Sequence, residues 1–180
     1  TDAVVAAALA SGGQVMAPAM TVEGGGQVSG RMAILADPAG GVFGVWEPHE
    51  HKGSGLANEP GSFAWNELLS RDPQASRDFL TALFGYEWKP MENSPMEYFS
   101  AKVGDGEVFG VMEMLPNMPE GVPSYWNTYF AVDDADDAVA RAVASGGTLL
   151  SKPTDTPFGR MAVIEDPQGA SFSIVALPAS

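Results

Sequence analysis

The chain contains no cysteine, which excludes disulfides, thiolate nucleophiles and cysteine-bound metals. This lack suits a reducing compartment, so we expect a cytoplasmic location. Basic residues are scarce: 9 Lys and Arg stand against 23 Asp and Glu, which gives a net charge of −14. A field of this sign repels phosphate backbones, so we expect no nucleic-acid partner. No apolar run approaches the roughly 20 residues of a membrane-spanning helix, and we expect no membrane partner.

An internal repeat is the most informative feature that is present. The segment GRMAILADPAGGVF (Gly30–Phe43) aligns with GRMAVIEDPQGASF (Gly159–Phe172), and both contain a DPxG turn. Upstream, TDAVVAAALASGG (residues 1–13) aligns with ADDAVARAVASGG (residues 135–147). The same helix, strand and turn order therefore recurs, which indicates that one small unit has been used more than once.

The periodicity of apolar residues predicts the remaining elements. A helix within residues 1–13 has Val4, Val5, Ala8 and Leu9 on one face and ends at two glycines. It is followed by a short strand that starts at residues 15–16, a glycine-rich loop at 23–27 and strands at 31–36 and 42–46. A second helix is predicted to begin after the N-cap Asp72 and to end at Gly85, and a third to begin after Asp134.

The predicted fold class is α+β, with paired βαβββ modules that form a curved mixed sheet around a concave cavity and place the helices outside. Residues 1–48 form a partial module whose opening strand is missing, and the polar residues 49–61 form a linker. Residues 62–180 form a complete domain with modules at 62–115 and 124–178. A single module is too small to bury its sheet face, so we expect modules to pair within the chain; a homodimer stays open.

This architecture with its DPxG turns resembles the vicinal oxygen chelate superfamily, which includes glyoxalases, bleomycin-resistance proteins and extradiol dioxygenases. The segments that carry the resemblance are WNELLSRDPQASRDFLTALFGYEW, YFAVDDADDAVARAVASGG and FGRMAVIEDPQGASFSIVALP. They are most similar to two-domain bacterial members described as glyoxalase-like or hydroxylases. Those members carry four modules, so this chain supplies three, and the resemblance implies an N-terminal glyoxalase-like domain of which residues 1–48 are the second module.

The resemblance also implies where metal ligands would lie. In metal-dependent members, His, Gln or Glu side chains project from the first and last strands of each module. The corresponding positions here are occupied by Trp65, Asn127, Gly44, Gly110 and Ser173. Because these side chains cannot form a tight divalent-metal site, we expect no metal and no cofactor.

Strand alternation suggests which side chains face the cavity. Glu67 and Tyr129 are the candidate catalytic residues, with Glu67 expected to be desolvated between Trp65 and Tyr129 and to have a raised pKa. The candidate ligand-binding residues are Trp65, Asn127, Met112 and Ser173. Arg31 and Arg160 recur at equivalent places in the repeat, and we expect both to pair with acidic neighbours for structural reasons.

Three functions remain open at this stage. The first is metal-independent binding of a small molecule, cationic or aromatic, in an acidic and aromatic-walled cavity. The second, by resemblance, is a glyoxalase-like lyase or a hydroxylase-type enzyme acting on a small metabolite. The third is a non-catalytic structural or regulatory module. Whether the protein is an enzyme is therefore left open.

Overall fold

The computed structural model describes residues 1–92, 94, 96–116 and 118–178. Its contacts divide the chain into two compact units. Thr1–Gly53 and Glu67–Trp126 form the first unit, and Ser54–Asn66 with the residues from Asn127 onward form the second. The division into residues 1–48, 49–61 and 62–180 remains a prediction. Residues 179 and 180 of that domain, and residue 117 of the linking segment after the 62–115 module, lie outside the described residues.

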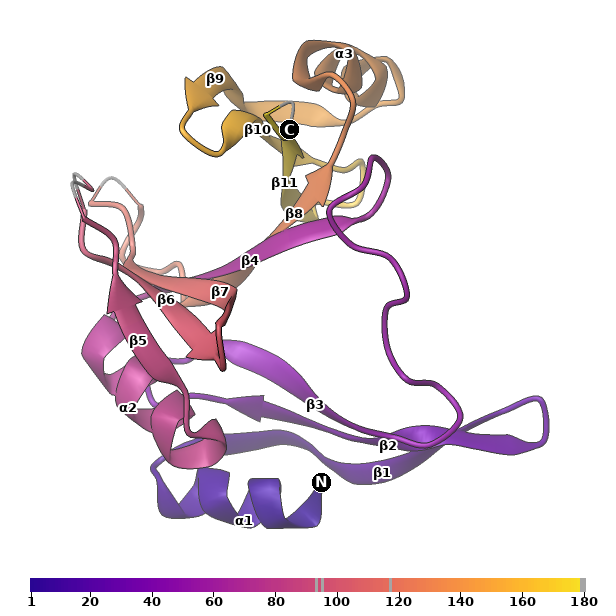
Figure 1. The fold of residues 1–180 in the computed structure, drawn as a ribbon, viewed down its shortest axis with the longest axis vertical. Coiled ribbons are helices and arrows are strands. Elements are labelled where there is room, and N and C mark those ends of the chain that lie inside the picture. The colour runs from indigo at the N-terminus through magenta and orange to yellow at the C-terminus, as the bar shows by residue number, and fades with distance from the viewer. Residues whose placement is uncertain (93, 95, 117, 179–180) are drawn as a thin grey trace. The chain divides into compact units, whose positions relative to one another are not determined.

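The N-terminal part of the first unit is one helix and a three-stranded antiparallel sheet of order β1-β2-β3 (Figure 1). Its elements are α1 (Asp2–Ala10), β1 (Gln14–Gly24), β2 (Gln27–Ala36) and β3 (Val42–Pro48). The short strand predicted to start at residues 15–16 is longer than expected, because β1 contains 11 residues. The predicted glycine loop is a tight hairpin, because Gly25 and Gly26 have φ values of 61° and 81° that a two-residue turn requires.

The other part of the first unit contains a helix and a sheet of order β5-β6-β7-β4. Its elements are β4 (Phe63–Ser70), whose C-terminal half belongs to this unit, α2 (Pro73–Phe84), β5 (Glu87–Pro90), β6 (Tyr98–Val103) and β7 (Gly106–Glu113). Both predicted boundaries of α2 are confirmed. The Asp72 side chain accepts a hydrogen bond from the Ala75 amide at 3.0 Å, and Gly85 ends the helix in the left-handed region with φ 70°.

Both parts of the first unit contribute to one hydrophobic core. Its buried members come from α1, β2, β4, α2, β6 and β7: Ala8, Leu35, Leu68, Phe79, Leu80, Ala101, Phe109 and Val111. Val4 and Val5 pack against this core as predicted, but Leu9 is 57% exposed, so its assignment to the same face was wrong. Since α1 is apolar on nearly every side, its sequence does not reveal which face is buried.

A buried polar network joins the first DPxG turn to α2. The Asp37 side chain is 1% exposed and accepts hydrogen bonds from the Gly41 amide at 2.7 Å and from the Ser76 hydroxyl at 2.6 Å. Ser76 also lies 2.8 Å from the buried hydroxyl of Ser70 at the end of β4. In the second copy of the turn, Asp166 is only half-buried and accepts from two backbone amides of its own turn.

The connection between β7 and β8 is fastened by Arg71. Its guanidinium donates hydrogen bonds to the carbonyl oxygens of Pro119 at 2.5 Å and Val122 at 2.8 Å. The buried Ser124 hydroxyl accepts a hydrogen bond from the Arg71 amide and donates one to the Ala39 carbonyl. Arg71 and Ser124 thus tie this connection to the end of β4 and to the first DPxG turn.

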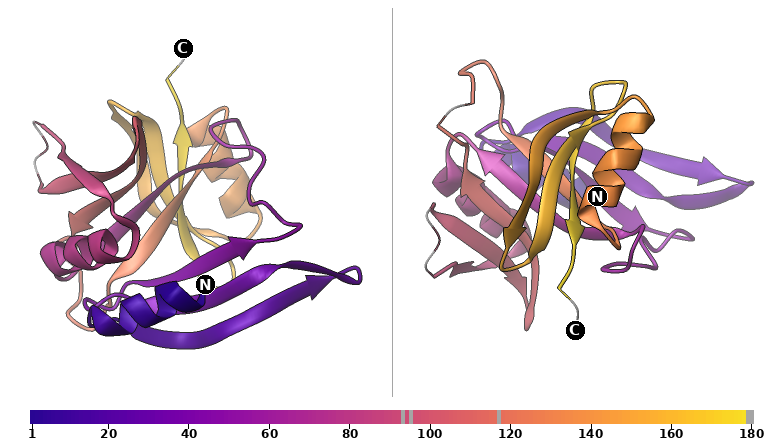
Figure 2. Two further views of the ribbon diagram at one scale, coloured as in Figure 1. Left: turned by 60° about the horizontal axis from the view of Figure 1, so that its bottom comes forward. Right: turned by 90° about the horizontal axis from the view of Figure 1, so that it is seen from above.

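The second unit is a helix on a mixed sheet that includes the N-terminal half of β4 and then β8, β11, β10 and β9 in that order (Figure 2). Its elements are β8 (Tyr125–Ala131), α3 (Ala135–Ala144), β9 (Thr148–Thr156), β10 (Gly159–Glu165) and β11 (Ser171–Ala176). Asp134 caps α3 as predicted, accepting from the Asp137 amide at 2.9 Å. Ile174 is buried in the core with Ala135, Ala138 and Val139 of α3, and Phe172 packs against this core.

The observed elements confirm the α+β class. One αβββ segment is followed by two complete βαβββ modules, each of which pairs its opening strand in parallel with its last strand. The described helices are short, and none is long and apolar enough to cross a membrane.

Candidate functional site

The candidate residue Glu67 lies on the face of β4 that is turned away from α2. Leu68 points into the core with Phe79 and Leu80 of α2, so strand alternation directs Glu67 to the opposite face. The parallel register places Glu67 opposite Gly110 of β7, and Leu69 opposite Met112. Glu67 and Met112 are both half-buried. They therefore share a sheet face that the helices of the first unit do not cover.

Tyr98 covers the glycine of this face. It lies on β6 opposite Met112, and its ring lies over Gly110 so closely that any Cβ at Gly110 would clash with the tyrosine hydroxyl. The family resemblance implies a metal-ligand position at Gly110, and here the phenol of Tyr98 from the neighbouring strand fills the space beside this glycine. Tyr98 could not be predicted from the sequence, because only the β6–β7 register reveals which residue of β6 reaches Gly110.

The charge of Glu67 affects the pKa of a second tyrosine, Tyr125, which was not among the predicted site residues. Burial raises the pKa of the Tyr125 phenol, and the negative charge of Glu67 raises it further. Tyr125 begins β8 and precedes Trp126, whose ring packs edge-on against Phe109 in the core at 5.2 Å between centroids. Glu67, Tyr98, Met112 and Tyr125, together with Gly110, are called the tyrosine–glutamate face below. The expected placement of Glu67 between Trp65 and Tyr129 stays a prediction, as does its raised pKa.

In the second unit, two predicted site residues contact each other directly. The Asn127 amide nitrogen donates a hydrogen bond to the Ser173 hydroxyl at 2.9 Å, and that hydroxyl lies 3.3 Å from the amide oxygen. Ser173 is 1% exposed and is the register partner of Tyr129 in the parallel β8–β11 pair. The first-strand and last-strand positions implied by the family resemblance therefore do converge in this module.

These residues do not fit the divalent metal that the fold family implies. At the converged positions of the second unit, a neutral amide and a hydroxyl satisfy each other, and neither is a strong ligand for such an ion. At the equivalent last-strand position of the first unit, Gly110 has no side chain and Tyr98 occupies the space. Among the described residues, no group of three or more His, Cys, Asp or Glu side chains is arranged to hold a metal ion.

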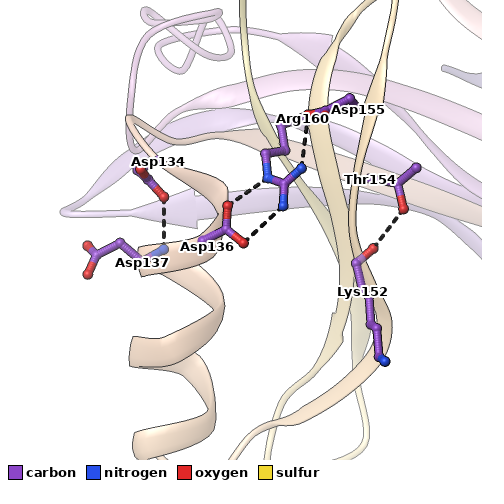
Figure 3. Close-up of polar contacts among 7 residues, drawn as sticks. All are labelled: Asp134, Asp136, Asp137, Lys152, Thr154, Asp155 and Arg160. Atoms are coloured by element: carbon purple, nitrogen blue, oxygen red, sulfur yellow. Dashed lines mark hydrogen bonds and ion pairs between the residues drawn. The ribbon is translucent and has the colours of Figure 1, made fainter.

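The repeated arginines form ion pairs, as predicted. Arg160 of β10 binds Asp136 near the start of α3 through two nitrogens, at 2.6 and 3.1 Å, and binds Asp155 of β9 at 2.9 Å (Figure 3). The hydrogen bond from Arg160 lowers the pKa of Asp136. Arg31 of β2 binds Asp2 of α1 at 2.8 Å in the same way. In each copy the arginine therefore ties a strand to the helix that precedes it.

Comparison with known proteins is consistent with this architecture. Residues 62–174 match the family model of the Glyoxalase/Bleomycin resistance protein/Dioxygenase superfamily. The chain therefore belongs to this superfamily.

Two curated relatives cover nearly the whole chain. It is 45% identical over 176 residues to "Putative glyoxylase CFP32" of Mycobacterium tuberculosis, covering 97% of this chain and 65% of that protein. It is 38% identical over 176 residues to "Anthracycline biosynthesis protein DnrV" of Streptomyces peucetius, covering 98% of this chain and 62% of that protein. The chain thus spans less than two thirds of the length of each of these relatives.

A solved structure has the same fold. The Mn(II)-bound glyoxalase from Novosphingobium aromaticivorans superimposes with a TM-score of 0.63 at 17% sequence identity, covering 97% of this chain and 58% of that one. At this level of identity the likeness concerns the fold alone.

Proposed function

We propose that the protein binds a small aromatic or cationic molecule on the tyrosine–glutamate face, without a tightly bound metal. The observation that carries this proposal is geometric: the half-buried Glu67 lies opposite Gly110 in the β4–β7 register, and the ring of Tyr98 lies over Gly110. A carboxylate among aromatic rings attracts cations both by its charge and through the ring faces. The net charge of −14 also raises the local concentration of cations.

The other candidate ligand contacts come from the sequence. Trp65, Asn127, Tyr129 and Ser173 stay predictions as ligand-binding or catalytic residues. The donor sets described above support a metal-free mode of binding, because they offer hydrogen bonds and ring surfaces rather than imidazole and carboxylate ligands.

The binding proposal can be tested with three matched aromatic probes. N-Methylquinolinium is a planar cation, quinoline is its neutral counterpart at neutral pH, and naphthalene-2-sulfonate is an anion of similar size. We expect calorimetry to show the order cation, neutral, anion in decreasing affinity. Glu67→Gln should weaken binding of the cation about tenfold, which corresponds to about 1.4 kcal/mol of binding free energy, while the affinity for quinoline should change little.

Glu113→Gln provides the matched control. Glu113 lies on β7 at the end of the same parallel strand pair, but its side chain is exposed. If Glu67→Gln and Glu113→Gln weaken binding of the cation equally, general electrostatic attraction explains the binding and the specific site is refuted. Absence of binding by all three probes would refute the proposal outright.

A spectroscopic test examines the site without any ligand. Because the charge of Glu67 helps to raise the pKa of Tyr125, Glu67→Gln should lower that pKa. Ultraviolet absorbance detects the tyrosinate, and Tyr125→Phe identifies which transition belongs to Tyr125. An unchanged Tyr125 transition in Glu67→Gln would show that the two groups do not interact.

A second candidate function is favoured by the names of the two relatives, one a glyoxylase and the other a biosynthesis protein. In this alternative, Glu67 acts as a general base on a small metabolite, with Tyr129 as its hydrogen-bonding partner. Turnover of the hemithioacetal of methylglyoxal and glutathione by the metal-free protein, lost in Glu67→Gln and kept in Glu113→Gln, would support it. Binding of the cation probe without turnover of this compound would favour the binding function.

A further inference from the structure

Arg77 of α2 is the one basic residue with a buried side chain among the residues that the structure describes, at 9% exposure. Arg31, Arg141 and Arg160 each form an ion pair with an aspartate. Arg77 forms none with a described residue, although the chain has 23 acidic residues. A buried cation without a carboxylate partner is unusual, because burying an uncompensated charge is costly.

The guanidinium of Arg77 is fixed by neutral groups. Its Nε donates a hydrogen bond to the Pro73 carbonyl at 3.3 Å, and its Nη2 donates one to the side-chain oxygen of Gln74 at 2.7 Å. The amide nitrogen of Gln74 in turn donates to Asp78 at 2.8 Å, which orients the amide group. The guanidinium carbon lies 3.5 Å from the centre of the Phe99 ring on β6. The group is therefore held along one edge and on one face.

Another edge of the same guanidinium still has donors to offer. The bonds to Pro73 and Gln74 use the edge formed by Nε and Nη2. Nη1 and the second hydrogen of Nη2 form the neighbouring edge, from which N–H groups point outward in parallel. No described residue accepts a hydrogen bond from Nη1, and Nη1 is not among the fully buried atoms without a partner, so it keeps contact with solvent. This parallel pair of donors matches the two oxygens of a carboxylate.

The charges around Arg77 favour an anion at this edge. The side chain reaches back to Pro73 in the first turn of α2, so the guanidinium lies near the positive end of the helix. The carboxylates of this segment bind other groups, since Asp72 accepts from the Ala75 amide at 3.0 Å and Asp78 accepts from Gln74. The positive charge of Arg77 therefore has no direct counter-charge within the described part of the chain.

We propose that Arg77 is a binding site for the carboxylate of a small organic acid, held by the edge that Nη1 and Nη2 form. A small acid suits the site, because the side chain is recessed and only 9% exposed. Phe99 pairs with Val111, which lies in the core with Phe79 and Leu80 of α2, so the site is on the helix-covered face of the sheet. Glu67 lies on the opposite face, and the proposal does not depend on the proposed ligand function.

Nuclear magnetic resonance of the 180-residue protein tests this proposal with acetate as the probe. Sodium acetate replaces sodium chloride at constant ionic strength, and the side-chain Nε–H signals of the arginines are followed. The Arg77 signal should move and reach saturation, whereas that of Arg160, which already binds Asp136 and Asp155, should not. The apparent affinity at Arg77 should exceed that at Arg160 at least about tenfold.

The neutral analogue acetamide is the control for charge. It has nearly the shape of acetate and should leave the signals of both arginines unchanged. A response to acetate that never saturates, an equal response at Arg77 and Arg160, or an equal effect of acetamide would overturn the proposal.

A matched pair of variants separates binding from a purely structural role. Arg77→Met keeps an apolar stem beside Phe99 and removes the charge, whereas Arg141→Met removes an exposed arginine of α3. Acetate should raise the thermal unfolding midpoint of the unsubstituted protein and of Arg141→Met, but not that of Arg77→Met. If Arg77 only fastens α2 to β6, Arg77→Met will unfold at a lower temperature in chloride and acetate will not stabilise the unsubstituted protein, which would refute the proposal. The acetate titration gives an answer even if Arg77→Met does not fold.

A peptide probe tests the source of the carboxylate. The blocked tripeptide acetyl-Ala-Glu-Ala-amide presents the same group on a polypeptide, and we expect it to bind Arg77 more weakly than acetate does, because the guanidinium is recessed. Tighter binding of the peptide than of acetate would overturn the assignment to a small acid and would identify an acidic segment of a partner protein instead.

Discussion

The clearest energetic prediction concerns the two copies of the DPxG turn, which have the same sequence pattern in different surroundings. Asp37→Ala removes a buried carboxylate that accepts hydrogen bonds from the Gly41 amide and the Ser76 hydroxyl. A hydrogen bond to a charged group contributes about 1.5–3 kcal/mol, so this substitution should cost about 3–5 kcal/mol of unfolding free energy. Asp166→Ala removes two partly solvated bonds to backbone amides and should cost about 1 kcal/mol.

Urea unfolding of both variants, followed by fluorescence and circular dichroism, measures this difference. A gap of about 3 kcal/mol corresponds to a change of roughly 100-fold in the unfolding equilibrium constant. Ser76→Ala should account for part of the larger cost, because it leaves Asp37 with one donor fewer. If Asp37→Ala costs no more than Asp166→Ala, burial under α2 contributes nothing and the reasoning fails.

Two further predictions concern close packing and charge. Gly110→Ala should displace the ring of Tyr98, lower the unfolding free energy by about 1–3 kcal/mol and alter the near-ultraviolet circular dichroism. Arg160→Gln should raise the pKa of Asp136 in a nuclear magnetic resonance titration, because the arginine lowers it. A carboxyl group whose pKa is lower in the folded state stabilises the fold at pH values above its unfolded-state pKa, and this stabilisation is lost as the pH falls through the folded-state pKa. The variant lacks this contribution, so it should lose less stability on acidification.

Each of these predictions has a matched control. Gly106→Ala, also on β7, places its Cβ 3.7 Å from the Val103 carbonyl and should leave stability nearly unchanged. Arg141→Gln breaks an exposed ion pair with Asp137 on α3 and should not move the pKa of Asp136. Equal effects of variant and control in either pair would contradict the assigned contacts.

Much of the fold could be predicted because the signals were local. The caps Asp72 and Asp134 and the stop Gly85 each need only a few neighbouring residues to be recognised. The repeat supplied the module order, and it also indicated that Arg31 and Arg160 have the same structural role. The error in β1, which is longer than expected, arose where small and polar residues weaken the alternation that marks a strand.

The site was harder to predict, because its contacts depend on register. Alternation could group Glu67 with Trp65 on one face of their strand, but the shared face with Met112 and the position of Tyr98 over Gly110 depend on how β7 pairs with β4 and β6. The influence of Glu67 on Tyr125 likewise depends on two strands far apart in sequence. No pattern within either segment contains that information.

The mutual hydrogen bonding of Asn127 and Ser173 has an evolutionary consequence. Replacing either residue alone by a metal-binding side chain would strip the other of its partner inside the module, at about 1–3 kcal/mol, with no coordinated ion to offset the loss. A metal site at these two positions would therefore require both residues to be replaced together. Substitutions at these two sites should covary among descendants, so that the pair is inherited as a unit.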